Sequence, residues 1–153
     1  MSFEGNRIVV IIPAFNEEKS ISKVINAIPN IVDEIIVINN GSDDSTAIKA
    51  SISGAKVIRE DRKGYGYACL KGIDYLHKNP PDIVVFLDGD YSDHPEEMEL
   101  LIKPIVEDGQ ELVIGSRALG AMENGAMMPQ QIFGNWLATT LIRLFYKYEF
   151  TDL

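Results

Sequence analysis

The chain has 153 residues, 46% of them hydrophobic, which is enough for one buried core and too few for two ordinary domains. Its 14 Lys and Arg against 23 Asp and Glu give a net charge of −9, and this excess of negative charge excludes nucleic acid as a partner. One cysteine excludes an internal disulfide. The N-terminus is polar and the apolar runs are interrupted, so the sequence predicts neither a secretory leader nor a bilayer span. We therefore expect a cytoplasmic protein.

Short apolar runs alternate with stretches of helical periodicity over the first 117 residues. The runs predict strands at residues 8–12, 35–38, 56–58, 83–87 and 112–114. The stretches between them predict helices over residues 16–28, around 47–50, from 66 to 76, and over 96–106. Strand-helix alternation of this kind predicts an α/β fold with a mostly parallel sheet between two layers of helices.

The composition changes after Arg117, so we predict two regions, 1–117 and 118–153. Residues 118–128 read as a loop, and an amphipathic helix is predicted from Pro129 onward. Its apolar face either packs against the sheet or lies at a subunit interface of a homo-oligomer or at a membrane surface. Trp136 beside Arg143 suits the membrane surface.

Polar clusters follow four of the predicted strands directly. They occupy residues 13–17, 39–44, 88–90 and 116–117. Because ligands of open parallel sheets bind beyond the carboxyl ends of the strands, we expect these clusters to form one site.

Asp88 and Asp90 come directly after an apolar strand, separated by Gly89. Alternation along an extended chain lets both carboxylates face one centre, while glycine permits close approach of a ligand. Two carboxylates, water and a diphosphate suit Mg²⁺ or Mn²⁺, which would also offset the negative charge of the protein. The same three residues alone also fit a plain turn. Their place among three other polar clusters favours a metal and diphosphate site.

Two groups of cations complete the candidate site. Arg59, Arg62 and Lys63 precede Gly64 in a loop suited to phosphate, or to an ordinary helix start. Arg117 has the planar fork that fits a phosphate or carboxylate, and it also fits a surface charge.

These motifs together resemble the family 2 glycosyltransferases with a GT-A fold, in particular the dolichyl- or polyprenyl-phosphate sugar transferases. The matching stretches are VVIIPAFNEE from Val9, IIVINNGSDDST from Ile35, KGYGYA from Lys63, FLDGDYSDHPEE from Phe86 and VIGSRALG from Val113. They cover almost the whole chain, and their order and spacing make the resemblance specific. It implies a three-layer, Rossmann-like nucleotide-diphospho-sugar transferase fold.

The resemblance also implies roles for residues. Those that it places at the nucleotide are Pro13, Ala14, Asn16, Glu17, Asn39, Asn40, Lys63, Gly64, Asp88 and Gly89. Asp88 would reach the ribose or the metal, Asp90 would hold the metal, and Arg117 would meet the acceptor or its phosphate. The helix after Pro129 resembles the family's interface helix, which implies peripheral contact with the inner membrane surface.

Two departures from the family pattern affect these expectations. Asn39-Asn40 stands where the family usually has Asp-Asp or Asp-Asn, and an amide both donates and accepts, so the donor base stays open between UDP and GDP types. The family continues beyond the point where this chain stops at Leu153, so we expect a protein truncated at its C-terminus.

The function expected from these observations is an inverting sugar transfer from a nucleotide diphosphate, with Asp88, Asp90 and Arg117 as the catalytic residues. The acceptor oxygen, from a lipid phosphate or a sugar, would attack the anomeric carbon while the metal holds the departing diphosphate. The alternatives are a nucleotide-binding or membrane-interaction module without turnover, and a phosphohydrolase with Asp88 as its nucleophile.

Overall fold

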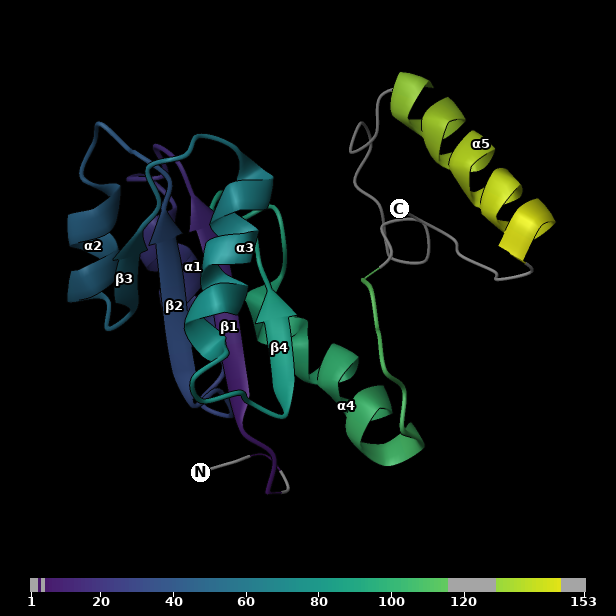
Figure 1. The fold of residues 1–153 in the computed structure, drawn as a ribbon, viewed down its shortest axis with the longest axis horizontal. Coiled ribbons are helices and arrows are strands. Elements are labelled where there is room, and N and C mark those ends of the chain that lie inside the picture. Colours follow the sequence, from purple (N-terminus) through teal and green to yellow (C-terminus); the bar gives the residue numbers. More distant parts are fainter. Residues whose placement is uncertain (1–2, 4, 116–128, 147–153) are drawn as a thin grey trace. The chain divides into compact units, whose positions relative to one another are not determined.

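The computed structural model describes residues 3, 5–115 and 129–146, and it divides the chain into two compact units, Met1–Gly109 and Gln110–Leu153 (Figure 1). The elements of the first unit are β1 (Ile8–Ala14), α1 (Ile21–Ala27), β2 (Glu34–Asn39), α2 (Thr46–Ile52), β3 (Lys56–Arg59), α3 (Tyr65–Leu76), β4 (Ile83–Phe86), the 3₁₀ turn η1 (Pro95–Glu97) and α4 (Met98–Asp108). The second unit contains α5 (Pro129–Tyr146).

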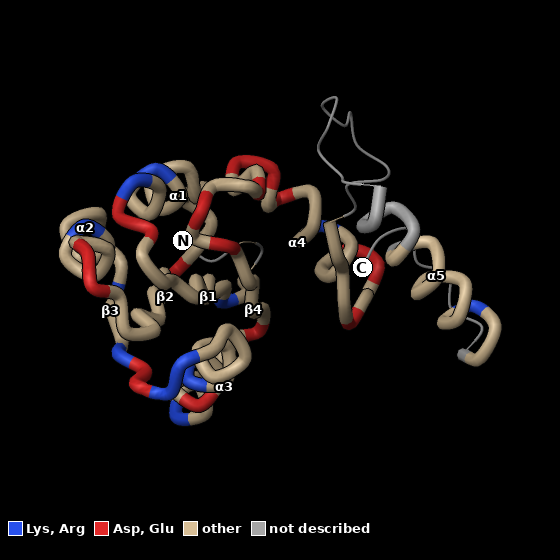
Figure 2. Tube along the Cα trace, turned by 90° about the horizontal axis from the view of Figure 1, so that it is seen from above, with Lys and Arg blue, Asp and Glu red and all other residues tan. Residues whose placement is uncertain are grey.

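The four strands form one parallel sheet in the order β3-β2-β1-β4. Seen from above, α1 and α2 lie on one face of this sheet and α3 on the other (Figure 2). The prediction of an α/β fold with a parallel sheet between layers of helices is therefore confirmed for this unit. The chain leaves β1 in one direction for β2 and β3 and returns on its other side as β4, which makes the β1–β4 junction the switch point of the sheet.

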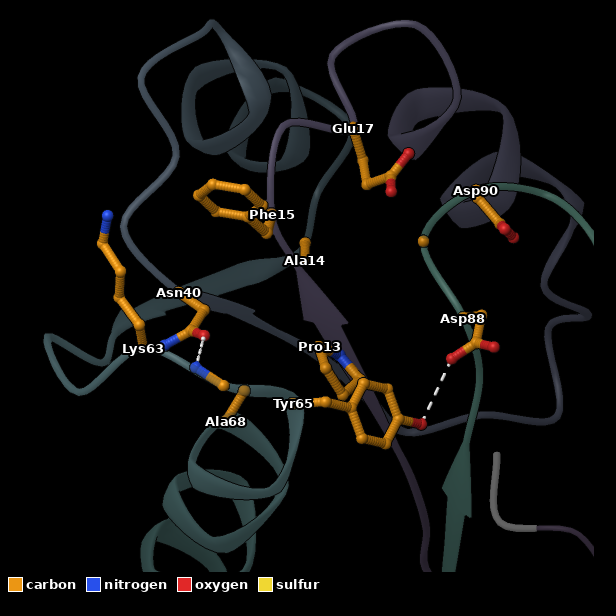
Figure 3. Close-up of a pocket in the computed structure, with 12 residues that line it drawn as sticks. Pro13, Ala14, Phe15, Glu17, Asn40, Lys63, Tyr65, Ala68, Asp88 and Asp90 are labelled. Atoms are coloured by element: carbon orange, nitrogen blue, oxygen red, sulfur yellow. Dashed lines mark hydrogen bonds between the residues drawn. The ribbon is translucent and has the colours of Figure 1, made fainter.

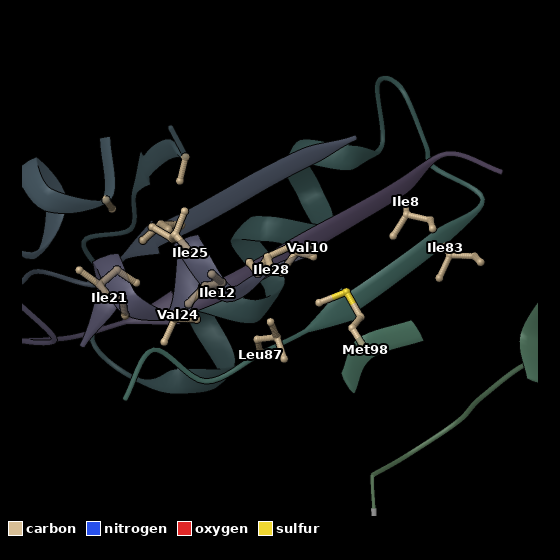
Figure 4. Close-up of a cluster of buried hydrophobic side chains, with 14 of the residues drawn as sticks. Ile8, Val10, Ile12, Ile21, Val24, Ile25, Ile28, Ile83, Leu87 and Met98 are labelled. Atoms are coloured by element: carbon tan, nitrogen blue, oxygen red, sulfur yellow. The ribbon is translucent and has the colours of Figure 1, made fainter. Parts of the chain in front are cut away.

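β1 is one of the two inner strands, and all seven of its residues are buried. Because successive side chains of a strand point to opposite faces, Val10 and Ile12 pack with α1 (Figure 4). Val9 and Ile11 pack with α3 on the other face. The α3 contact is very close at Gly72, where an added Cβ would lie 2.7 Å from Ile11 Cγ2. The absence of a side chain at Gly72 is what lets α3 approach the sheet.

Several helix and strand boundaries differ from the sequence prediction, most clearly in β1 and α1, and one predicted element is missing. β1 continues through Pro13 to Ala14, and α1 begins at Ile21 instead of residue 16. The strand predicted at residues 112–114 is wrong, because the structure has no strand in this segment. A strand is stabilised by its partner, and a short apolar run does not by itself show whether a partner is present.

α5 begins at Pro129, as the sequence predicts. Trp136, Leu144 and Phe145 are exposed on it. Among the residues that the structure describes, no helix is both long and apolar enough to cross a bilayer. The division of the chain at residue 117 and the surface that this helix contacts stay predictions.

Candidate functional site

A pocket of about 470 Å³ lies beyond the carboxyl ends of β1 and β4, beside the first turn of α3 (Figure 3). This volume is in the usual range for small-molecule sites. The residues that line it are Pro13, Ala14, Phe15, Glu17, Asn40, Lys63, Gly64, Tyr65, Ala68, Asp88, Gly89 and Asp90.

Two loops that form the rim above β1 and β2 are joined by hydrogen bonds. The backbone N–H of Asn16 donates to Ser42 Oγ (3.1 Å), and the N–H of Asp43 donates back to Asn16 Oδ1 (2.9 Å). The N–H of Glu17 donates to Thr46 Oγ1 (2.8 Å). Asn16 takes a left-handed conformation, φ 59°, which asparagine tolerates better than most residues. The side chain of Asn16 is therefore used to hold the neighbouring loop.

Asn40 fixes the opposite loop, residues 60–64. Its Nδ2 donates to the carbonyl oxygens of Glu60 (3.1 Å) and Arg62 (2.7 Å), and its Oδ1 accepts from the N–H of Gly64 (2.8 Å). The residue is 6% exposed. An aspartate could accept the Gly64 bond but could not donate the other two. The amide at this position is thus required by the loop that it holds.

The basic loop after β3 carries its own counter-charges. The nearly buried carboxylate of Glu60 accepts from the backbone N–H of Arg62 (2.8 Å) and from its guanidinium (2.9 Å to Nε and to Nη2). These bonds, led by those from the Arg62 side chain, lower the pKa of Glu60 to about 2. Arg59 pairs with Asp61 at 2.6 Å. Lys63 is the cation of this loop that lines the pocket.

The two aspartates after β4 are each held by one oxygen. Asp88 Oδ1 accepts from the Tyr65 hydroxyl (3.1 Å), and Asp90 Oδ1 accepts from the N–H of Ser92 (2.8 Å). The N–H of Asp88 donates to Asp93 Oδ2 (3.1 Å). Partial burial raises the pKa of Asp88, the hydrogen bond from Tyr65 opposes this, and the charges of Asp93 and Asp90 add to the rise. The carboxylate is thus in a site that favours a bound cation or proton.

Gly89 serves the packing of the protein as well as access to the pocket. A Cβ at this position would lie 3.2 Å from Glu17 Cγ and 3.5 Å from the carbonyl oxygen of Pro13. The loop after β4 therefore approaches the loop after β1 closely enough to close one side of the pocket.

The carboxylates fit a divalent metal that is shared with a ligand. Within the described residues, no three His, Cys, Asp or Glu side chains are grouped to hold a metal by themselves. Asp88 and Asp90 offer hard oxygen donors at one side of the pocket, which Mg²⁺ and Mn²⁺ prefer, and these ions commonly complete their shell with water and phosphate oxygens. The donor set thus suits a metal bound together with a diphosphate.

Most of the residues predicted for the site line this one pocket. Asn16 and Asn39 are at its rim instead, where Asn39 Oδ1 accepts from the N–H of Ser42 (3.0 Å). Arg117 is outside the described residues. The sequence prediction missed Phe15, Tyr65 and Ala68. Phe15 lies inside the polar cluster at residues 13–17, and Tyr65 and Ala68 have the i, i+3 spacing of one helix face immediately after Gly64.

A pocket at the switch point of a parallel sheet, with paired carboxylates and a nearby lysine, defines an α/β protein built to bind an anionic ligand. The chain belongs to the Glycosyl transferase family 2, whose sequence model matches residues 9–152. The family and the fold expected from the sequence motifs are thus confirmed.

Relatives with named activities agree with this assignment. The chain is 32% identical over 164 residues to a UDP-N-acetylglucosamine–dolichyl-phosphate N-acetylglucosaminyltransferase of Methanococcus voltae, covering 95% of this chain and 65% of that one. It is 37% identical over 123 residues to a glucosyl-3-phosphoglycerate synthase of Mycobacterium tuberculosis, covering 71% and 37%. The crystal structure of that synthase with Mn²⁺, UDP and glucosyl-3-phosphoglycerate superimposes with a TM-score of 0.59 over 68% of this chain and 41% of the synthase. The chain spans less than two thirds of the length of these relatives.

Proposed function

We propose that this chain is the donor-binding part of a glycosyltransferase that takes a UDP-sugar together with Mg²⁺ or Mn²⁺. The observation that carries the proposal is a pocket that joins Lys63, Asp88 and Asp90 at the switch point of the sheet. UDP and not GDP is proposed because the names of both relatives above refer to uridine donors or complexes. The metal is proposed because the synthase structure contains Mn²⁺ with UDP.

The lining of the pocket suggests how a donor lies in it. Phe15 presents a half-exposed ring on the side of Asn40 and Lys63, and this side suits the base (Figure 3). All the hydrogen bonds of the Asn40 amide described above are made to the protein. We therefore propose that Asn40 shapes the base site and does not form hydrogen bonds to the edge of the base. Asp88 and Asp90 are on the other side and suit the diphosphate with its metal, which would neutralise the charge that builds on the leaving group.

The reaction proposed is an inverting displacement. An acceptor oxygen attacks the anomeric carbon, a new C–O bond forms, and the bond to the diphosphate breaks with its electron pair going to the diphosphate oxygen. We propose a polyprenyl phosphate as acceptor, supported by the dolichyl-phosphate enzyme among the relatives. A phosphate oxygen is already ionised and requires no general base. Arg117 remains our candidate for contact with that phosphate. Trp136 and Phe145 are exposed on α5, and this helix is our candidate for peripheral contact with the inner membrane surface.

Calorimetric titration with UDP and GDP, with and without MnCl₂, tests the donor site. We expect UDP to bind more tightly in the presence of the metal, and Asp90→Asn to weaken that binding by roughly tenfold or more, as the loss of a metal-site group does. Asp108→Asn, an exposed aspartate at the end of α4, is the matched control and should bind like the wild type. Binding that ignores both the metal and the Asp90 change would refute the proposal. If UDP binding depends on the metal but no sugar is transferred to polyprenyl phosphate, the result supports a nucleotide-binding module without turnover.

A further inference from the structure

The first turn of α3 reaches both sides of the pocket through two adjacent residues. The N–H of Gly64 donates to Asn40 Oδ1 at 2.8 Å, and the hydroxyl of Tyr65 donates to Asp88 Oδ1 at 3.1 Å (Figure 3). One bond ends on the loop after β2 and the other on the loop after β4. The start of α3 thus connects the side of the pocket assigned to the base with the side assigned to the diphosphate.

The Asn40 end of this connection is held rigidly. Asn40 is nearly buried and makes three hydrogen bonds to residues 60–64. Gly64 has φ 131°, which a residue with a side chain rarely adopts, so the chain enters α3 in a conformation that needs glycine. Further along the helix, Gly72 rests directly on Ile11. α3 is therefore held both at its start, where Tyr65 lies, and within the helix at Gly72.

The Asp88 end is held less firmly by the rest of the protein. Asp88 lies two residues beyond β4, which is an edge strand of the described sheet. Its carboxylate lies near Asp90 and Asp93, whose charges repel it. The hydroxyl of Tyr65 is the side-chain donor that meets this carboxylate in the structure. A carboxylate held by one oxygen keeps its other oxygen available in a fixed direction.

We propose that Tyr65 is a positioning residue that aims the Asp88 carboxylate at the bound metal and diphosphate, and that Asn40 is the anchor that keeps Tyr65 in place. The inference rests on the proposed function, because it assigns a direction to one of the two carboxylates of that site. The tyrosine acts before the ligand arrives. It removes part of the rotamer freedom that Asp88 would otherwise lose on binding.

The first test is Tyr65→Phe, which keeps the ring and removes the hydroxyl. Calorimetry would measure UDP binding across a series of Mn²⁺ concentrations and again in EDTA. We expect the Mn²⁺ concentration for half-maximal UDP binding to rise by roughly tenfold, as for the loss of a hydrogen bond to a charged group, while UDP binding in EDTA is unchanged. Tyr67→Phe, on the same helix and outside the pocket lining, is the control and should match the wild type.

Three results separate this inference from the proposed function. If wild-type protein binds no UDP with metal, the proposed function fails first. If the wild type binds as expected and Tyr65→Phe has the same Mn²⁺ dependence, Tyr65 does not position Asp88. If Tyr65→Phe weakens UDP binding equally with and without metal, the hydroxyl contacts the nucleotide itself, which also overturns the positioning role.

A double-mutant cycle with Asn40→Asp tests the anchor. Aspartate keeps an acceptor for Gly64 but directs a carboxylate at the carbonyl oxygens of Glu60 and Arg62, which should loosen the start of α3. In that background we expect Tyr65→Phe to shift the Mn²⁺ dependence by less than about threefold, because interacting sites are not additive. A full tenfold shift in both backgrounds would exclude Asn40 as the anchor. The single Tyr65 variant remains decisive if the Asn40 variant does not fold.

Discussion

Replacing Gly72 by alanine tests how closely α3 must approach the sheet. A Cβ at this position would meet three side-chain atoms of Ile11, at 2.7, 2.9 and 3.2 Å. Ile11 is fully buried in β1 and branched at Cβ, so its Cγ2 cannot turn away without a change of rotamer. Gly66 lies on the same helix, and a Cβ there meets nothing within 4 Å. The two glycines therefore form a matched pair.

The expected magnitudes follow from two opposing effects. Alanine in place of glycine stabilises a helix by up to about 1 kcal/mol, while overpacking a core costs about 1–3 kcal/mol. We therefore expect Gly66→Ala to raise the free energy of unfolding slightly and Gly72→Ala to lie about 1–3 kcal/mol below it. Urea unfolding at equilibrium measures the difference between the two variants. A Gly72→Ala protein as stable as Gly66→Ala would refute the close packing of α3 on β1.

Two further predictions concern the loops around the pocket. The pKa of Glu60 is lowered from near 4.5 to about 2 by its bonds to Arg62, so its contribution to stability is present above pH 4.5 and is lost as the pH falls toward 2. Glu60→Gln should therefore lose less stability than the wild type between pH 4.5 and pH 2. The measurement is the urea midpoint of unfolding as a function of pH, and parallel curves for the two proteins would contradict the lowered pKa of Glu60. Thr46→Val removes the buried acceptor of the Glu17 N–H and should lower the free energy of unfolding by about 1–3 kcal/mol. Urea unfolding measures this difference. An unchanged free energy of unfolding would show that this bond does not hold the rim.

The sheet was predictable because its strands have unambiguous patterns. Residues 8–12 are five consecutive apolar residues, and such a run fits a strand covered on both faces. The run at residues 112–114 is as short as the one at residues 56–58, which does form a strand, so length alone does not decide between strand and loop. The start of α1 was misplaced because the polar residues 16–18, which are typical of a helix start, form hydrogen bonds to the loop at residues 42–46. A contact between segments that are distant in sequence leaves no periodic pattern.

The place of the site was predictable from topology, whereas the directions of its side chains were not. The rule that ligands bind at the carboxyl ends of parallel strands brings together residues 88–90 and most of residues 13–17, and these residues line one pocket. The rule does not show that Asn40 turns its amide toward residues 60–64. It also does not show that Tyr65 reaches Asp88, because that bond depends on where α3 begins and how closely it packs.

The hydrogen bonds between the two rim loops matter for anyone who wishes to redesign the donor preference of this pocket. Substituting Asn16, Ser42 or Thr46 would remove hydrogen bonds that join the two loops. Most such variants would therefore disturb the structure of the rim without creating a new binding preference. Phe15 and Lys63 line the cavity from loops that other residues hold in place. A combinatorial library restricted to these two positions would sample new selectivities on an intact scaffold.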